Sequence, residues 1–420
     1  MYKSRLCASS PHMAAADVEL PVLEKFVDAA GDASAPVSYI SFSGLSFMYA
    51  TWLAPNTSDG YALDQSGFHL TGTDHSANTI GHDPNDVGTP GNVNFVYAQN
   101  IVFENNTFAH MGAIALEFGT GSQDNEISNN TFTDISAAAI QLGGIAPQDH
   151  HPETESQLTR DNLISNNLVK YAGQEFYDAP GIYIGFTTRT TVEHNEISHV
   201  PWSGIAIGWG WGLLDPGGFP GLMQYNDCLP NTGATPYEWG VYDTPSAAQG
   251  NQIVHNRIEY FLEKLWDGGA IYSSGFQGTS LEDGQLIAWN VAMNKRAAAG
   301  GNTFYTDGGS RYITLLGNVS LNNPPGTMDF GPCLKDSSFP GLCLLTGILP
   351  YGADMGGCVP YGEMVFDTNY LLDPFTFYRP ITCNNTNVPN YPVDLTFIDN
   401  VKVTSAADVP AEILDEAGRQ

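Results

Sequence analysis

The segment from Trp266 to Asn318 contains two copies of one short pattern. It reads Trp-Asp-Gly-Gly-Ala-Ile-Tyr-Ser-Ser-Gly at residues 266–275, Ala-Trp-Asn-Val at 288–291, Phe-Tyr-Thr-Asp-Gly-Gly-Ser at 304–310 and Leu-Gly-Asn-Val at 316–319. In each copy a short apolar run ends in Tyr, and an Asp-Gly-Gly triplet lies beside it. Short apolar runs between Gly and Asn turns are typical of β-strands. The pattern therefore predicts a repeated β unit that carries acidic side chains.

The same unit recurs from residue 98 onward, and each copy is marked by an Asn at a turn. The spacing of the markers ranges from 24 residues, between the first two, to 61 residues, between the fourth and fifth. Repeats of roughly 20–50 residues indicate a solenoid, and helical periodicity is absent. We predict an all-β fold, a right-handed parallel β-helix with three strands per coil, in which stacked asparagines bond along the turn. The marker residues are Asn106, Asn130, Asn167, Asn195, Asn256, Asn290 and Asn318.

The ends of the repeat region define the expected domain. Residues 1–17 show no periodicity and are expected to be disordered or the remnant of a preceding segment, whereas residues 18–420 are expected to form a single β-helix domain. Within it, Val18–Val27 and Val37–Trp52 alternate apolar and polar residues, as strands do. The closing Val409–Ala417 predicts a short helix that caps the open end of the coil stack, because open strand edges need a cover.

Long loops are expected on one face. The two wide marker spacings contain residues 144–160 and 210–247, and insertions of this kind usually wall a binding groove. A third polar excursion is expected at Asn322–Pro360. It carries three of the four C-terminal cysteines.

Composition limits the partners. The chain has 420 residues with 15 Lys plus Arg against 45 Asp plus Glu, a formal net charge of −30. Such a surface repels nucleic acid, anionic membranes and polyanionic glycans, so we expect a neutral partner, and we expect a monomer. No apolar run approaches the roughly 20 residues that span a bilayer.

Cysteines and sequons favour secretion, although no signal peptide is visible at the start. Four of the six cysteines cluster near the C-terminus, and we expect them to form two disulfides of unassigned pairing. The clustered cysteines are Cys333, Cys343, Cys358 and Cys383. The Asn-X-Ser/Thr sequons begin at Asn56, Asn105, Asn129, Asn318 and Asn384.

Several segments together resemble a known family. They are Val-Glu-Leu-Pro-Val-Leu-Glu at 18–24, Pro-Val-Ser-Tyr-Ile-Ser-Phe at 36–42, Tyr-Asp-Ala-Pro-Gly-Ile-Tyr at 177–183, Pro-Trp-Ser-Gly-Ile-Ala-Ile-Gly-Trp at 201–209 and Asp-Gly-Gly-Ala-Ile-Tyr at 267–272. These resemble secreted right-handed β-helix carbohydrate-active proteins, and most of all glycoside hydrolase family 141 and its relatives. The resemblance covers residues 18–417 and implies glycoside hydrolysis by two aspartates on adjacent coils, at positions that Asp267 and Asp307 match. Such proteins normally carry a further N-terminal portion, which this chain largely lacks.

Three aspartates are the candidate catalytic residues. Asp178 and Asp267 share one column when coils are aligned on Asp-X-X-X-Ile-Tyr, and Asp307 lies on the coil after Asp267, past the strand end. Because coils stack ~4.8 Å apart, such carboxylates can lie ~5–10 Å from each other, as glycoside hydrolysis requires. We expect Asp267 and Asp307 to be the pair and Asp178 a reserve. The alternative is that Asp-Gly-Gly is a turn only.

Aromatic residues flank these aspartates. Exposed aromatic rings beside acids indicate sugar subsites, and an apolar wall would raise the pKa of one carboxyl; core packing is the competing interpretation for Trp. A Glu near the same face is expected to be a helper, and an Arg is expected to orient a carboxylate. The candidate substrate-binding residues are Trp202, Trp209, Trp211, Trp266, Tyr272, Tyr305, Glu175 and Arg311.

Histidines are expected to be structural. His194 and His255 each precede a marker Asn and are expected to stack with one another. The pair His150 and His151 lacks a third ligand at metal spacing, so we predict no metal site and no cofactor.

Two other functions stay open at this stage. A polysaccharide lyase or epimerase acting on uronates would use Ca²⁺ or a basic residue, yet the segment holds only Lys264, Lys295, Arg296 and Arg311 nearby. A solenoid that only binds glycan would need the aromatic residues and not the carboxylates.

Overall fold

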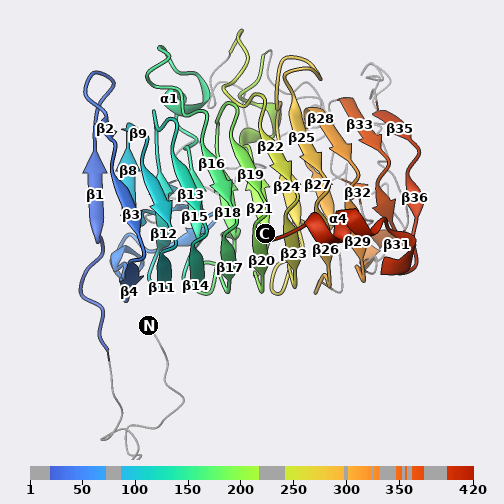
Figure 1. The fold of residues 1–420 in the computed structure, drawn as a ribbon, viewed down its shortest axis with the longest axis horizontal. Coiled ribbons are helices and arrows are strands. Elements are labelled where there is room, and N and C mark those ends of the chain that lie inside the picture. Colours follow the sequence, from blue (N-terminus) through green and yellow to red (C-terminus); the bar gives the residue numbers. More distant parts are fainter. Residues whose placement is uncertain are drawn as a thin grey trace, which may run out of the picture.

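This computed structural model describes residues 19–71, 87–216, 242–297, 301–323, 326–330, 347–351, 355–356, 362–372 and 395–420. They wind into a parallel β-helix in which each coil adds one strand to each of three sheets (Figure 1). Within each of these three sheets, neighbouring strands are parallel and come from successive coils. The coils therefore stack along one axis, as the repeat predicts.

The strands of each sheet are given in spatial order. Sheet 1 contains β1 (Val27–Ala30), β8 (Gly91–Val96), β12 (Ile114–Phe118), β15 (Ile140–Leu142), β18 (Ile182–Ile184), β21 (Ile205–Ile207), β24 (Ile271–Ser273), β27 (Phe304–Thr306) and β32 (Met355–Gly356). Sheet 2 contains β3 (Ser41–Ser43), β10 (Val102–Glu104), β13 (Glu126–Ser128), β16 (Leu163–Ser165), β19 (Thr191–Glu193), β22 (Gln252–Val254), β25 (Gln285–Ala288), β28 (Arg311–Leu316), β33 (Gly362–Asp367) and β35 (Leu395–Ile398). Sheet 3 contains β4 (Ser46–Met48), β11 (Thr107–Met111), β14 (Thr131–Ile135), β17 (Leu168–Lys170), β20 (Glu196–Ser198), β23 (Arg257–Glu259), β26 (Val291–Met293), β29 (Val319–Leu321), β34 (Tyr370–Leu371) and β36 (Val401–Lys402).

Smaller elements decorate the solenoid. The additional strands are β2 (Val37–Ser38) paired with β9 (Ala98–Gln99), β30 (Gly326–Phe330) paired with β31 (Gly347–Tyr351), and the antiparallel set β5 (Ala62–Leu63), β6 (Phe68–Leu70) and β7 (Val87–Gly88). The helical elements are α1 (Pro147–His150), α4 (Ala411–Glu416) and the 3-10 turns η2 (Ala54–Asn56), η3 (Gly210–Gly212) and η5 (Ala406–Asp408). The helices in the described ranges are too short and polar to cross a membrane.

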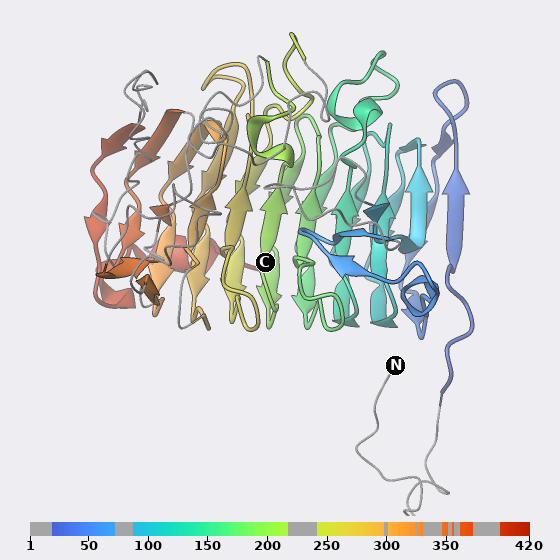
Figure 2. The ribbon, with the colours of Figure 1, turned by 180° about the vertical axis from the view of Figure 1, so that it is seen from behind.

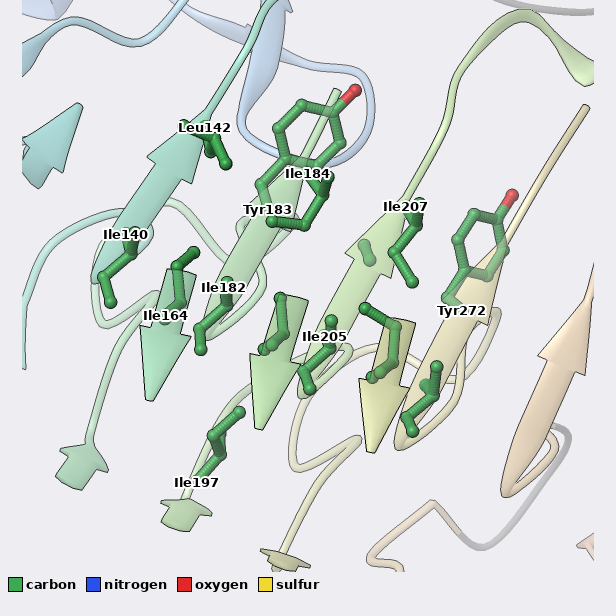
Figure 3. Close-up of a cluster of buried hydrophobic side chains, with 14 of the residues drawn as sticks. Ile140, Leu142, Ile164, Ile182, Tyr183, Ile184, Ile197, Ile205, Ile207 and Tyr272 are labelled. Atoms are coloured by element: carbon green, nitrogen blue, oxygen red, sulfur yellow. The ribbon is translucent and has the colours of Figure 1, made fainter. Parts of the chain in front are cut away.

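Side chains that point between the sheets form a continuous apolar core. Ile140, Ile182, Ile205 and Ile271 stand in register on four neighbouring strands of sheet 1, and each is at most 1% exposed (Figure 3). Burying one such side chain contributes roughly 1.5–3 kcal/mol. The strict alternation along these short strands therefore fixes which residues face inward.

The predicted asparagine ladder is present between sheets 2 and 3. The backbone N–H and the side-chain Nδ2 of Asn106 both donate to Oδ1 of Asn130, over 2.9 Å and 3.0 Å. This pattern repeats through all the marker residues and continues beyond them to Asn369 and Asn400. The side-chain amide of Asn carries both a donor and an acceptor, so each buried Asn satisfies backbone groups of the turn that would otherwise lack partners.

The residue before each ladder Asn turns the corner with a left-handed backbone. His194 has φ +52° and His255 has φ +55°. Their rings stack with centroids 5.0 Å apart and an interplanar angle of 6°. The predicted stacking of these two histidines is confirmed.

The C-terminal helix is present, but it does not cap the end of the stack. After α4 the chain runs back along the flank, where the N–H of Gly418 donates to the carbonyl of His255 and the N–H of Gln420 donates to Asn166 in the middle of the solenoid (Figure 1). Val291 and Val319 point outward from sheet 3 and are buried in the same apolar cluster as the residues flanking α4. The capping prediction was wrong because these outward apolar side chains, rather than the open strand edge, receive the cover.

Other expectations need correction or stay open. Residues 19–26 form no strand, and β1 begins only at Val27, since Pro21 cannot donate to a β ladder. The sequon at Asn318 is fully buried in the ladder and is not accessible to a glycan in the folded chain. All six cysteines, residues 1–17 and most of 322–360 lie outside the described ranges, so the disulfide prediction stays a prediction.

Candidate active site

The outer face of sheet 1 carries a row of three tyrosines and one alanine. Tyr183, Ala206, Tyr272 and Tyr305 stand in register on β18, β21, β24 and β27. Figure 3 shows Tyr183 and Tyr272 on the side of the sheet that faces away from the core isoleucines. Although the row points outward, these four residues are at most 2% exposed. Other segments of the chain must therefore cover this face.

Asp267 and Asp307 reach the row from opposite ends of the strands and make crossed contacts. Asp267 precedes β24, and its Oδ1 accepts a hydrogen bond from the hydroxyl of Tyr305 on the next coil over 3.1 Å. Asp307 directly follows β27, and its Oδ2 accepts from the hydroxyl of Tyr272 on the previous coil and from Nε1 of Trp211 over 3.2 Å. The rings of Tyr272 and Tyr305 meet edge to face at 5.3 Å. Two coils thus share one acidic site.

Each Asp-Gly-Gly triplet packs against a Trp. Gly309 has φ +70°, and a Cβ there would lie 2.4 Å from the carbonyl oxygen of Trp211. A Cβ on Gly268 would lie 2.4 Å from Nε1 of Trp202, which donates to the carbonyl of Asp267 over 2.6 Å. Glycine is required at both positions because any side chain would collide with these contacts. The triplets are therefore close-packed turns that also present a carboxylate.

The surroundings of the site shift the pKa values of Asp267 and Tyr272. Burial and, second, the negative charge of Asp307 raise the pKa of Asp267 to about 6, while the hydrogen bond from Tyr305 opposes this shift. Asp267 is nevertheless exposed at the surface as a residue. Burial, followed by the charge of Asp307, raises the pKa of Tyr272 well above its ordinary value, which keeps its hydroxyl protonated as a donor. Asp307 accepts two hydrogen bonds, from Tyr272 and from Trp211.

Most of the predicted aromatic subsites are packed inside the protein. Trp266 is 44% exposed beside Asp267 and remains a candidate platform for a sugar ring. Trp202 and Trp209 are each 2% exposed, so the prediction of open stacking faces was wrong for them. Trp209 packs against Phe68 at 4.8 Å and against Trp211 at 5.3 Å. Their indole faces are occupied by other side chains of the protein.

Asp178 does not join the pair. It is 2% exposed, and its carboxyl accepts hydrogen bonds from the N–H of Gly67 over 3.2 Å and from the hydroxyl of Tyr61 over 3.4 Å. Burial raises its pKa to about 7. The reserve role fails because this carboxyl is enclosed and anchors the β5–β6 hairpin.

The contacts described for the predicted helper residues are made outside the acidic pair. Arg311 lies in sheet 2 and forms an ion pair with Glu363 at 2.7 Å. Glu175 lies exposed in the same loop as Asp178. Among the contacts described for these two side chains, none is with Asp267 or Asp307.

The hairpin formed by residues 61–71, which contains β5 and β6, was not foreseen from the sequence. It crosses the outer face of sheet 1 (Figure 2), where Phe68 contacts Tyr183 at 5.3 Å. The side chain of Gln65 lowers the pKa of Tyr272 slightly, which places this hairpin beside the site. The available signal was the long interval between residues 37–52 and the first marker Asn, which exceeds one coil.

The two inserted loops leave sheet 1 at the same edge, after β15 and β21, as expected. His151 stacks on Tyr242 at 4.0 Å, and the N–H of Ala247 donates to the carbonyl of His150 over 2.9 Å. The two histidines therefore join one loop to the other. Within the described ranges, no three His, Cys, Asp or Glu side chains gather as a metal site.

Comparison with known proteins agrees with this architecture. The family model described as right handed beta helix region matches residues 56–212. The predicted fold class, including the hand of the helix, is confirmed. A search of curated proteins gave no significant match.

A solved structure titled "Glycoside hydrolase" has a similar fold. It aligns with a TM-score of 0.62 and 18% sequence identity over 96% of this chain and 53% of that chain. The present chain thus spans about half the length of that protein. Similarity at this level of identity shows a common fold.

Proposed function

We propose that the protein is a glycoside hydrolase for a neutral glycan, with Asp267 as the general acid and Asp307 as the base or nucleophile. The observation that carries this proposal is the crossed contact between two coils, in which each aspartate accepts a hydrogen bond from the tyrosine of the other coil. The pKa of Asp267 is raised by burial and by the neighbouring Asp307 carboxylate, and a raised pKa suits a carboxyl group to act as the general acid. The solved glycoside hydrolase with a similar fold supports the class.

The reaction would proceed through the two carboxyl groups. Asp267 would give its proton to the glycosidic oxygen as the bond from that oxygen to the anomeric carbon breaks. Asp307 would activate the water that attacks this carbon, or attack the carbon itself and be released by water. The exposed ring of Trp266 would stack on the sugar. Trp211 and Tyr272 would hold Asp307 in position.

The electrostatics support a neutral substrate and a hydrolase over a lyase. The net charge of −30 disfavours uronate chains. Among cations near the site, Lys295 is buried, and its Nζ donates to the carbonyl of Gly301 over 2.8 Å. Secretion is a further proposal, and the cysteine cluster and the sequons support it. A monomeric state is also a proposal.

A substrate panel tests the proposal. Purified protein would be incubated with aryl glycosides and neutral plant and fungal polysaccharides, and new reducing ends would be measured for wild type and Asp267→Asn. Hydrolysis by wild type, and its loss on the polysaccharides in a folded Asp267→Asn protein, support the proposal. Unsaturated products would identify a lyase, and retention on a glycan without products would identify a binding protein; either result contradicts the proposal.

A further inference from the structure

The outer face of sheet 1 would form a continuous groove if nothing covered it. Glu117, Gln141, Tyr183, Ala206 and Tyr272 occupy one in-register row on successive strands. Strands lie ~4.8 Å apart, so this row would offer an extended track for a glycan chain. The two aspartates of the proposed site lie at the Tyr272 end of the track.

The hairpin of residues 61–71 blocks this track between the site and the N-terminal coils. Phe68 is 3% exposed and fills the space over β18 and β21, where it contacts Tyr183 at 5.3 Å and Trp209 at 4.8 Å. Tyr183 and Ala206 are both fully buried although they point outward. Figure 2 shows the hairpin lying across the strands.

Several contacts fix the hairpin as a wall rather than a movable lid. The buried carboxyl of Asp178 accepts from the N–H of Gly67 and from Tyr61. The ring of Tyr61 also packs on Phe176 at 4.6 Å. The N–H of Thr89 donates to the carbonyl of Gly67, which ties the hairpin to the strand that leads into sheet 1. An enclosed, hydrogen-bonded anchor of this kind opposes local opening.

We propose that this wall makes the enzyme act on the ends of neutral glycan chains, releasing terminal sugars instead of cutting inside a polymer. The inference rests on the proposed function. A glycan that continued along the row past Tyr272 would have to occupy the space that Phe68 and Trp209 already fill. The accessible side of the site is marked by Asp267 and Trp266, which are exposed. A chain end can enter from that side.

The product distribution of the wild-type protein tests this inference. Each neutral polysaccharide that the panel shows to be hydrolysed would be digested to low conversion, and solution viscosity and product length would be followed together. We expect terminal mono- or short oligosaccharides of one length and almost unchanged viscosity. A ladder of long products with an early fall in viscosity would overturn the inference and leave the hydrolase assignment intact. Absence of hydrolysis on the whole panel would instead overturn the proposed function, and this inference with it.

Variants locate the cause in the hairpin. Phe68→Ala would open the track, and we expect internal cleavage products to rise relative to terminal ones by roughly 10-fold or more. Phe176→Ala is the matched control, because it removes a ring from the same hairpin contacts without opening the row. Phe68→Leu, which keeps most of the apolar volume, should shift the products less in the same direction. A folded Phe68→Ala or Phe68→Leu protein with the wild-type product pattern would show that the hairpin does not set chain-end action.

Discussion

The hydroxyl of Tyr305 donates a hydrogen bond to Oδ1 of Asp267 over 3.1 Å, although the two residues belong to neighbouring coils. The reverse contact joins Tyr272 to Asp307. Because the two tyrosines are paired in register on β24 and β27, the spacing of the coils sets the geometry of the acidic pair. The solenoid thus positions two carboxyl groups that lie far apart in the sequence.

Removal of the Tyr305 hydroxyl should change the pH dependence of hydrolysis. The hydrogen bond from Tyr305 lowers the pKa of Asp267, so Tyr305→Phe should raise that pKa and move the alkaline limb of kcat/KM to higher pH. Loss of a hydrogen bond to a charged group should also lower kcat by roughly 10- to 100-fold. Tyr183→Phe is the control, since its hydroxyl donates to the carbonyl of Gly208. An unmoved limb in Tyr305→Phe would argue against Asp267 as the acid.

The charge of Asp307 should be visible in the titration of Asp267. Asp307→Asn removes a negative charge that raises the pKa of Asp267, so the carboxyl of Asp267 should titrate at lower pH in this variant. Carbon-13 NMR of labelled aspartate, with Asp267→Asn used to assign the signal, measures this directly. An unchanged titration would mean that the two carboxyl groups do not interact.

Asp178 should affect stability and not turnover. Its pKa is about 7 in the fold against an ordinary value of 3.8, so the folded chain binds this proton more tightly than the unfolded chain does. The stabilisation is fully present below about pH 4 and is lost as pH rises through 7.

Relative to Asp178→Asn, the free energy of unfolding of the wild type should therefore fall by up to about 4 kcal/mol across this range. Urea denaturation at several pH values measures the difference. Loss of hydrolysis in a folded Asp178→Asn protein would restore this residue as a catalytic candidate.

The asparagine ladder should be sensitive to single truncations. Asn256→Ala removes the acceptor of the Asn195 N–H and the donor to the carbonyl of Val192, all of them buried. Each unsatisfied buried group costs about 1–3 kcal/mol, so the free energy of unfolding should fall by several kcal/mol. Asn105→Gly, at an exposed corner with φ +56°, is the control and should change stability by less than about 1 kcal/mol. Equal effects of the two substitutions would contradict the ladder.

The sequence carried most of the information about the fold. Strand alternation and the marker asparagines determine the inward face and the corner of each coil, because both depend on local side-chain chemistry repeated in every coil. The same logic placed Asp267 and Asp307 on adjacent coils. It could not foresee that α4 runs back over Val291 and Val319, since their outward direction follows from the register of sheet 3.

The contacts of the site that occur in one coil only could not be predicted from the sequence repeat either. The hairpin that carries Phe68 has no counterpart in other coils, so no periodicity reveals where it docks. Its docking explains why Trp209 is buried and why Asp178 anchors backbone. Burial of a Trp depends on what covers it, which the residues of its own coil do not specify.

The dependence of hydrolysis on the leaving group tests the assignment of Asp267 and Asp307 most directly. A general acid matters for a sugar leaving group and much less for an acidic phenol, whereas a base or nucleophile matters for both. We predict that Asp267→Asn hydrolyses glycans ~10²–10⁴-fold more slowly than the wild type but keeps most of its rate on nitrophenyl glycosides. Asp307→Asn should lose its activity on both substrate classes. Wild-type rates on both substrate classes in either folded variant would contradict the catalytic pair.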